Sequence, residues 1–286
     1  MILLQEHTKR LIDNTITGSV HGILLSGPPG AGKGHAARYV AHKKLGLETP
    51  EQLAVYPYFE AVLPENGSIS IDQIRQLQRF LQLKTPGTAG IRRIVIIEDA
   101  HLMTAEAQNA LLKSLEEPPA DTLLILTAPA TLRLKKTIYS RVQQIPILPL
   151  SKDQTTQHFE QDFPPTLVAK AHAISGGSIG LMHALLHAED HALLAEVQRA
   201  KTLLSGTPFD RLASVDELSK QKDVLPLFLQ ACKLICSTAL HQSAQKGQPK
   251  QVQRWHHALQ AVYDTEAALP HNPNPKLLLS DLLLAV

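Results

Sequence analysis

A glycine-rich segment carries the clearest chemical signal in this sequence. It runs through Gly27, Pro28, Pro29, Gly30, Ala31, Gly32 and Lys33, and it matches all but the last position of the phosphate-loop pattern. Glycines in such a loop let backbone N–H groups point at phosphate oxygens, and the lysine reaches the terminal phosphates. The segment therefore predicts weak or structural binding of a phosphate-bearing ligand such as ATP. The alternative is a Gly/Pro-rich turn with a surface lysine.

The residues that would hold a metal ion depart from this pattern. The position after Lys33 normally carries a Ser or Thr hydroxyl that binds Mg²⁺, but here it is Gly34, so the loop lacks its own Mg²⁺ ligand. Glu98 and Asp99 follow an apolar run, in the reverse of the usual order of a metal-binding Asp before a Glu. Because a displacement of around 1 Å can cost about a hundredfold in rate, we expect this acid pair to support little hydrolysis.

These residues need a strand before the loop, a helix after it and a second strand under the acid pair. Up to residue 149, short apolar runs alternate with helical patterns, which is typical of an α/β fold with a parallel sheet and helices on both faces. The pattern predicts strands over 22–25, 58–63, 93–97, 123–128 and 144–147, and helices over 32–45, 71–83 and 104–115. Thr104 is a plausible N-cap for the last of these helices.

The strand signals stop after residue 150. Short helices broken at 163–165 and 175–177 are expected first, then long helices separated near 206–208, 247–249 and 270–275. We therefore predict three parts: an α/β domain over 1–149, a small helical lid domain over 150–190, and an all-helical domain over 191–286 that serves oligomerisation.

Composition limits the function classes. With 28 Lys and Arg against 26 Asp and Glu, the formal charge is +2, which is too small for a self-sufficient DNA-binding domain. The two cysteines, Cys232 and Cys236, build neither a disulfide framework nor a four-cysteine zinc site, so they are expected as buried thiols. No signal-peptide pattern or long apolar run is visible, and we expect a cytoplasmic protein without membrane contact.

Several separated motifs together resemble the clamp-loader branch of the AAA+ ATPases, and within it the subunits of bacterial DNA polymerase III. The resemblance covers about residues 23–147 and weakens to an approximate helical pattern beyond 150. Its motifs are the loop at 27–33, the segment 71–75, the strand end at 96–101, the segment 107–119 and the segment 137–141. The stretch 109–119 is very specific to this family.

The resemblance implies roles for further residues. In this family a Ser-Arg-Cys motif supplies an arginine finger to the neighbouring subunit's nucleotide, and Ser140, Arg141 and Val142 stand at its place. Thr127 is the candidate for sensor 1, a polar residue at a strand end. Gly180 replaces the family's lid arginine, and the family's zinc knuckle is missing, so no zinc is expected. The alternative for Arg141 is a solvated surface charge.

The resemblance also implies partners: a hetero-pentamer with gamma/tau-type and delta-type subunits, a sliding clamp, and primer-template DNA reached through the assembly. The first hypothesis is a subunit that hydrolyses little or no ATP and presents Arg141 to a motor subunit. The second is a gamma/tau-type motor ATPase that tolerates Gly34. A third, a P-loop small-molecule kinase, leaves the segment 109–119 unexplained. Arg92 and Arg93 are expected as a solvated strand entry, with contact to the DNA backbone as the alternative.

Overall fold

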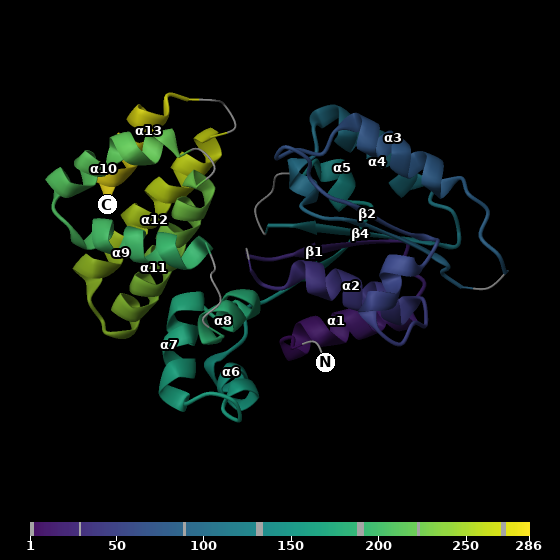
Figure 1. Ribbon diagram of the computed structural model, residues 1–286, viewed down its shortest axis with the longest axis horizontal. Helices are drawn as coiled ribbons and strands as arrows, with labels where there is room; N and C mark the ends of the chain where they lie inside the picture. Colours follow the sequence, from purple (N-terminus) through teal and green to yellow (C-terminus); the bar gives the residue numbers. More distant parts are fainter. Residues whose placement is uncertain are drawn as a thin grey trace. The chain divides into compact units, whose positions relative to one another are not determined.

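The computed structural model describes residues 3–28, 30–87, 90–129, 134–187, 192–221, 224–269 and 273–286 (Figure 1). The chain forms two compact units, residues 1–151 with 178–180, and residues 152–177 with 181–286. The second unit joins segments that the sequence assigns to a lid and to a C-terminal domain. The division into three domains therefore stays a prediction.

The first unit is built on a five-stranded parallel sheet with the strand order β2-β3-β4-β1-β5. The strands are β1 (Gly22–Ser26), β2 (Phe59–Val62), β3 (Arg93–Ile97), β4 (Thr122–Ala128) and β5 (Gln143–Pro146). Each of the five strands predicted from the sequence is confirmed to within about two residues of its ends. Every residue of β3 and β4 is buried, as expected for central strands covered on both faces.

Helices cover both faces of this sheet, which confirms the predicted layers (Figure 1). The elements are α1 (Glu6–Thr17), α2 (Lys33–Lys44), α3 (Ile71–Leu81), α4 (Ala105–Glu116), α5 (Lys136–Tyr139) and the 3₁₀ turns η1 (Pro50–Val55) and η2 (Ala100–Leu102). Alternate residues of β3 separate two cores: Ile94 and Ile96 pack with α1 and α2, whereas Val95 and Ile97 pack with α3, α4 and α5. Thr104 caps α4 as predicted, because its hydroxyl accepts from Ala107 N.

The second unit is entirely helical where the structure describes it. Its helices are α6 (Lys152–Phe159), α7 (Pro165–Ser175), α8 (Ile179–Leu186), α9 (Ala192–Ser205), α10 (Pro208–Lys220), α11 (Leu225–Gln245), α12 (Pro249–Ala268) and α13 (Pro275–Ala285), and the first two residues of α8 belong to the first unit. The predicted breaks are confirmed where the structure describes them, although residues 270–272 of the last one lie outside the described residues, and a further break separates α10 from α11. Its sequence signal is Pro226 in the first turn of α11.

The longest helix, α11, supplies the centre of the second core. Phe228, Cys232 and Cys236 are fully or almost fully buried there. Burial raises the pKa of Cys236 to about 11 and raises the pKa of Cys232 well above its ordinary value, so both thiols stay protonated at neutral pH. The expectation of two buried core thiols is confirmed.

Candidate functional site

The glycine-rich loop joins β1 to α2 at the carboxyl end of the sheet. Gly30 and Gly32 have φ values of 73° and 86°, in the left-handed region that favours glycine. Gly32 directly precedes α2, and no side chain caps the amides of the first turn of that helix. These free amides and the partial positive charge of the helix N-terminus suit a phosphate group. Pro29 lies outside the described residues.

Gly27 is required for a steric reason. A Cβ atom at this position would lie 2.4 Å from the carbonyl oxygen of Ile147, which is backbone and cannot move aside. We expect Gly27→Ala to lower the free energy of unfolding by about 1–3 kcal/mol, the usual cost of overpacking. Urea denaturation would measure this loss. Gly206→Ala is the control, because its Cβ would come no closer than 3.3 Å to any neighbour. Equal losses in the two variants would contradict the steric argument.

Lys33 is folded over the loop that it follows. Its Nζ donates to the carbonyl oxygens of Gly27 at 2.9 Å and Pro28 at 3.0 Å. Burial lowers the pKa of Lys33, and the charge of Asp99 opposes this shift. These two carbonyl oxygens hold the ammonium group at the loop. A phosphate group bound there would compete with them for the ammonium group.

The two acids after β3 point to different partners. The Oε1 atom of Glu98 lies 2.7 Å from Nη1 of Arg38, which comes from α2. Asp99 has a φ of 48°, and its half-exposed carboxylate lies 3.9 Å from Nδ1 of His101. Glu98 therefore pairs with Arg38 of α2, whereas Asp99 acts on Lys33 through its charge, and a catalytic role for either acid stays a prediction.

Position 34 lies directly against Glu98 and Arg38. A Cβ atom at Gly34 would come within 3.3 Å of Arg38 Nη1 and 3.5 Å of Glu98 Oε2. Mg²⁺ needs a close shell of oxygen ligands. Here position 34 offers no oxygen from a side chain, and a guanidinium group already pairs with the carboxylate. These residues do not fit a Mg²⁺ ion.

Sequence reasoning did not single out Arg38. Its signal is its position four residues after Gly34, which places both residues on the same face of α2.

Thr127 has a clear structural partner. Its hydroxyl is buried near the end of β4 and accepts a hydrogen bond from Asp99 N at 2.9 Å. It therefore fixes the turn that follows β3, and its role as sensor 1 stays a prediction.

Residues 178–180 belong to the same compact unit as the loop. The amide of Gly180 donates to the carbonyl oxygen of Gly30 at 3.0 Å. A Cβ atom at Gly180 would lie only 2.9 Å from that oxygen, so this approach requires glycine. The place where the family resemblance expects a lid arginine is therefore occupied by a contact between two backbones.

Arg141 lies apart from the loop residues, in the turn that follows α5. Its Nη2 atom is 2.6 Å from Oε1 of Glu116, the last residue of α4. Its Nη1 atom donates to Thr137 O at 3.0 Å and to Ser140 Oγ at 3.2 Å. About a third of the side chain is exposed, so the guanidinium is both oriented and accessible.

The arginine pair at the start of β3 corrects an expectation. Arg93 is 1% exposed and donates through Nη1 to Leu81 O at 2.6 Å and through Nη2 to Leu83 O. Arg92 pairs with Asp121 at 3.5 Å. The interpretation of a solvated strand entry is therefore wrong for Arg93, because its side chain ties the end of α3 to the sheet. Its burial also removes it as a candidate for contact with DNA.

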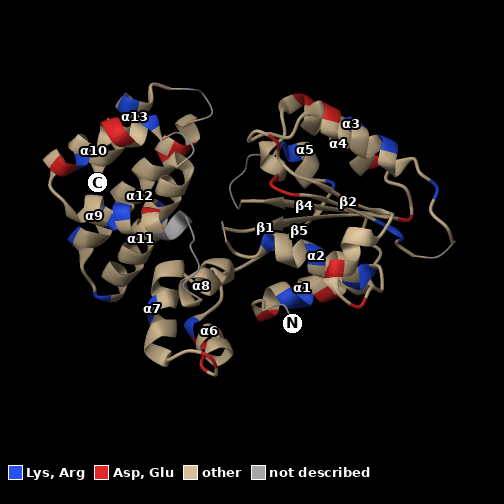
Figure 2. Ribbon diagram, viewed as in Figure 1, with Lys and Arg blue, Asp and Glu red and all other residues tan. Residues whose placement is uncertain are grey.

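Charges of both signs are interspersed over the helices of each unit (Figure 2). On α3, Arg75 pairs with Asp72 at 3.1 Å and both side chains are mostly exposed.

No helix in the described part of the chain is long and apolar enough to cross a bilayer.

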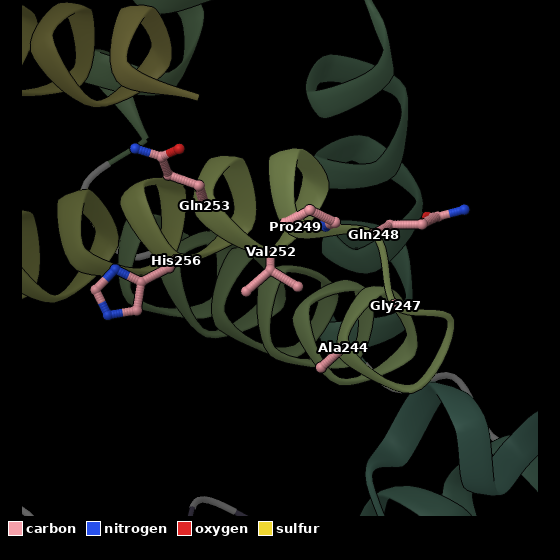
Figure 3. A pocket seen from close by; sticks show the side chains of 7 residues that line it. All are labelled: Ala244, Gly247, Gln248, Pro249, Val252, Gln253 and His256. Atoms are coloured by element: carbon pink, nitrogen blue, oxygen red, sulfur yellow. The ribbon is translucent and has the colours of Figure 1, made fainter.

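A hollow of about 590 Å³ lies where α11 ends and α12 begins (Figure 3). It is lined by Ala244, Gly247, Gln248, Pro249, Val252, Gln253 and His256. Figure 3 shows the side chains of Gln248, Gln253 and His256 pointing in different directions, so polar groups do not converge on one ligand. Among the described residues, no group of three or more His, Cys, Asp or Glu side chains could hold a metal ion.

The sheet order, the phosphate loop after β1 and the helical second unit define an AAA+ P-loop protein, as predicted. Residues 4–151 match the model of the family described as "DNA polymerase III, delta subunit". The chain therefore belongs to that family, and the predicted resemblance is confirmed.

Individual relatives agree with this assignment. The chain is 33% identical over 177 residues to the DNA polymerase III subunit delta' of Bacillus subtilis, covering 57% of this chain and 53% of that protein. It is 35% identical over 176 residues to the delta' subunit of Pseudomonas aeruginosa, covering 55% and 53%. The chain thus spans about half the length of these relatives.

Other similar proteins carry different names. The DNA polymerase III subunit tau of Bacillus subtilis is 30% identical over 154 residues, which is 49% of this chain and 27% of that protein. A solved structure of a DNA polymerase III gamma subunit-related protein from Thermotoga maritima has a TM-score of 0.49 and 19% identity, with 98% of each chain covered.

Proposed function

We propose that this chain is a delta-prime-type subunit of a bacterial clamp loader. It would assemble with gamma/tau-type and delta-type subunits into a hetero-pentamer that loads a sliding clamp onto primer-template DNA. Membership of the DNA polymerase III delta subunit family supports this proposal.

In this proposal the chain hydrolyses little or no ATP at its own loop. The observation that carries it is the pairing of Glu98 with Arg38 beside Gly34, because position 34 then offers no hydroxyl and Glu98 is already paired with a cation instead of Mg²⁺. The glycines and Lys33 still suit phosphate groups, so nucleotide would serve as a structural ligand. Arg141, oriented by Glu116 on an accessible turn, would act on the nucleotide of the adjacent motor subunit.

The isolated chain provides the direct test of this division of labour. We expect its ATP turnover with Mg²⁺ to be no higher than the background of the assay, and Lys33→Ala to leave that rate unchanged. A purified gamma/tau-type subunit serves as the positive control. Turnover that Lys33→Ala abolishes would instead support the second candidate, a motor ATPase.

The second candidate also rests on a specific observation. The loop keeps Lys33 and the glycine conformations of Gly30 and Gly32, and subunit tau of Bacillus subtilis is among the similar proteins. A motor subunit would need another source of Mg²⁺ ligands, because Gly34 has no hydroxyl. The turnover assay separates the two candidates without a reconstituted complex.

A further inference from the structure

The start of α2 contains a cation of its own at the place where P-loop enzymes bind a metal ion. In those enzymes the metal lies between the hydroxyl after the loop lysine and an acidic side chain at a strand end. In this chain the corresponding positions are Gly34 and Glu98. The guanidinium of Arg38 approaches both: its Nη1 lies 2.7 Å from Glu98 Oε1, 3.4 Å from Gly34 O and 3.3 Å from a Cβ built on Gly34.

The missing side chain at position 34 is what makes room for this arrangement. A threonine there would put a methyl and a hydroxyl group beyond a Cβ that is already within 3.3 Å of Arg38 Nη1 and 3.5 Å of Glu98 Oε2. The tip of the Arg38 side chain would have to shift to make room for these atoms. A hydroxyl at position 34 would therefore compete with Arg38 for the space beside Glu98.

Electrostatics gives the pairing a consequence for ligands. An unpaired Glu98 carboxylate near the loop would repel phosphate groups unless a metal ion neutralised it. Arg38 supplies that neutralisation permanently, because a guanidinium keeps its charge at all relevant pH values. With about 42% of its side chain exposed, Arg38 also remains open to an incoming anion.

We propose that Arg38 takes the place of the divalent cation and that the loop binds a nucleoside di- or triphosphate free of Mg²⁺. The inference rests on the proposed nucleotide-binding role of the loop. Lys33 and the first amides of α2 would hold the phosphate chain, and Arg38 would balance Glu98 beneath it. The ligand is bound without being cleaved, and the site needs no metal ion for affinity.

Equilibrium titration of the full chain with ADP and with ATP tests this proposal. Each nucleotide is titrated once in EDTA and once with excess Mg²⁺. We expect binding in EDTA to be at least as tight as binding with Mg²⁺. Arg38→Met should weaken binding in EDTA by about tenfold or more, the usual cost of losing a charge-assisted contact. Arg10→Met is the matched control, because Arg10 is an exposed arginine of the same unit and pairs only with Glu6 in the described contacts.

Two further variants separate a charge effect from a loss of local structure. Arg38→Lys keeps the positive charge and should retain more affinity in EDTA than Arg38→Met. The double variant Gly34→Thr/Arg38→Ala restores the hydroxyl and frees Glu98, so its binding should become tighter with Mg²⁺ than in EDTA. Circular dichroism confirms that each variant is folded.

The outcomes distinguish this inference from the proposed function. Binding that requires Mg²⁺ in the unmodified chain would overturn the inference, and so would the absence of binding in both buffers. Neither result would contradict the proposed action of Arg141 on a neighbouring subunit. Tight binding in EDTA that Arg38→Met does not weaken would also overturn the role of Arg38.

Discussion

Arg141→Ala is expected to slow ATP hydrolysis at the adjoining motor subunit of the reconstituted clamp loader by about 10³-fold or more. An arginine finger acts by placing its charge on the phosphoryl group as negative charge develops there, so the loss appears in the chemical step. A loader in which only that motor subunit can hydrolyse ATP isolates the affected site. Single-turnover hydrolysis with primer-template DNA and clamp present is the measurement.

The contacts of Arg141 determine which control variants suit this experiment. Arg141→Lys keeps the charge but loses the planar fork of donors, and it should recover only part of the rate. Arg10→Ala removes an exposed arginine of the same unit that lies outside the family motifs, and it should leave the rate unchanged. Glu116→Gln weakens the ion pair that holds Arg141 in the isolated chain, without removing the guanidinium. Unchanged hydrolysis in a fully assembled Arg141→Ala loader would refute the proposed role.

The second large effect concerns stability. Arg93→Met should lower the free energy of unfolding by about 3–5 kcal/mol, because it removes one partner of a buried charged network. The carbonyls of Leu81 and Leu83 would lose their donor, and Asp121 would lose a nearby cation. Urea denaturation measures the loss. Arg75→Met is the control, because an exposed arginine paired with Asp72 contributes only about 0–1 kcal/mol.

The partner of Arg93 adds a pH dependence. Burial alone would raise the pKa of Asp121, but hydrogen bonds from Thr85 and Thr122 and the charge of Arg93 together lower it. A carboxyl group whose pKa is lowered by folding stabilises the protein above its ordinary pKa, and this contribution disappears as the pH falls through the lowered value. The stability difference between the unmodified chain and Asp121→Asn should therefore be full at neutral pH and shrink below about pH 4. A difference that stays constant into acid would contradict this account.

The sequence predicted most of the sheet because its signals are local. Ile94, Val95, Ile96 and Ile97 form a short β-branched apolar run that is typical of a central strand, and glycines mark the loop before α2. The helix α1 was not predicted, because two of its three buried residues are Thr8 and Thr15, which weakens the hydrophobic period. Sequence spacing could not show which threonines face a core.

The site was harder to predict where it depends on partners distant in the chain. Arg92 and Arg93 look alike in sequence, yet the strand register buries one and leaves the other at the edge of the core. The absence of a Mg²⁺-binding hydroxyl at Gly34 could be recognised from the position of this residue alone. That Arg38 fills the resulting space follows only from the approach of β3 to α2, which brings Glu98 within 2.7 Å of it.

The contact between Gly180 and Gly30 has a consequence for mutational scanning. Both atoms of this hydrogen bond are backbone atoms, so truncating side chains to alanine cannot remove it. Any substitution at Gly180 instead adds atoms that crowd the carbonyl oxygen of Gly30. The effect of such a variant on stability therefore measures this crowding and not the loss of the hydrogen bond. An amide-to-ester replacement at residue 180 deletes the donor while keeping the shape. Semisynthesis therefore tests a backbone contact between the phosphate loop and residues 178–180 that side-chain substitution cannot remove.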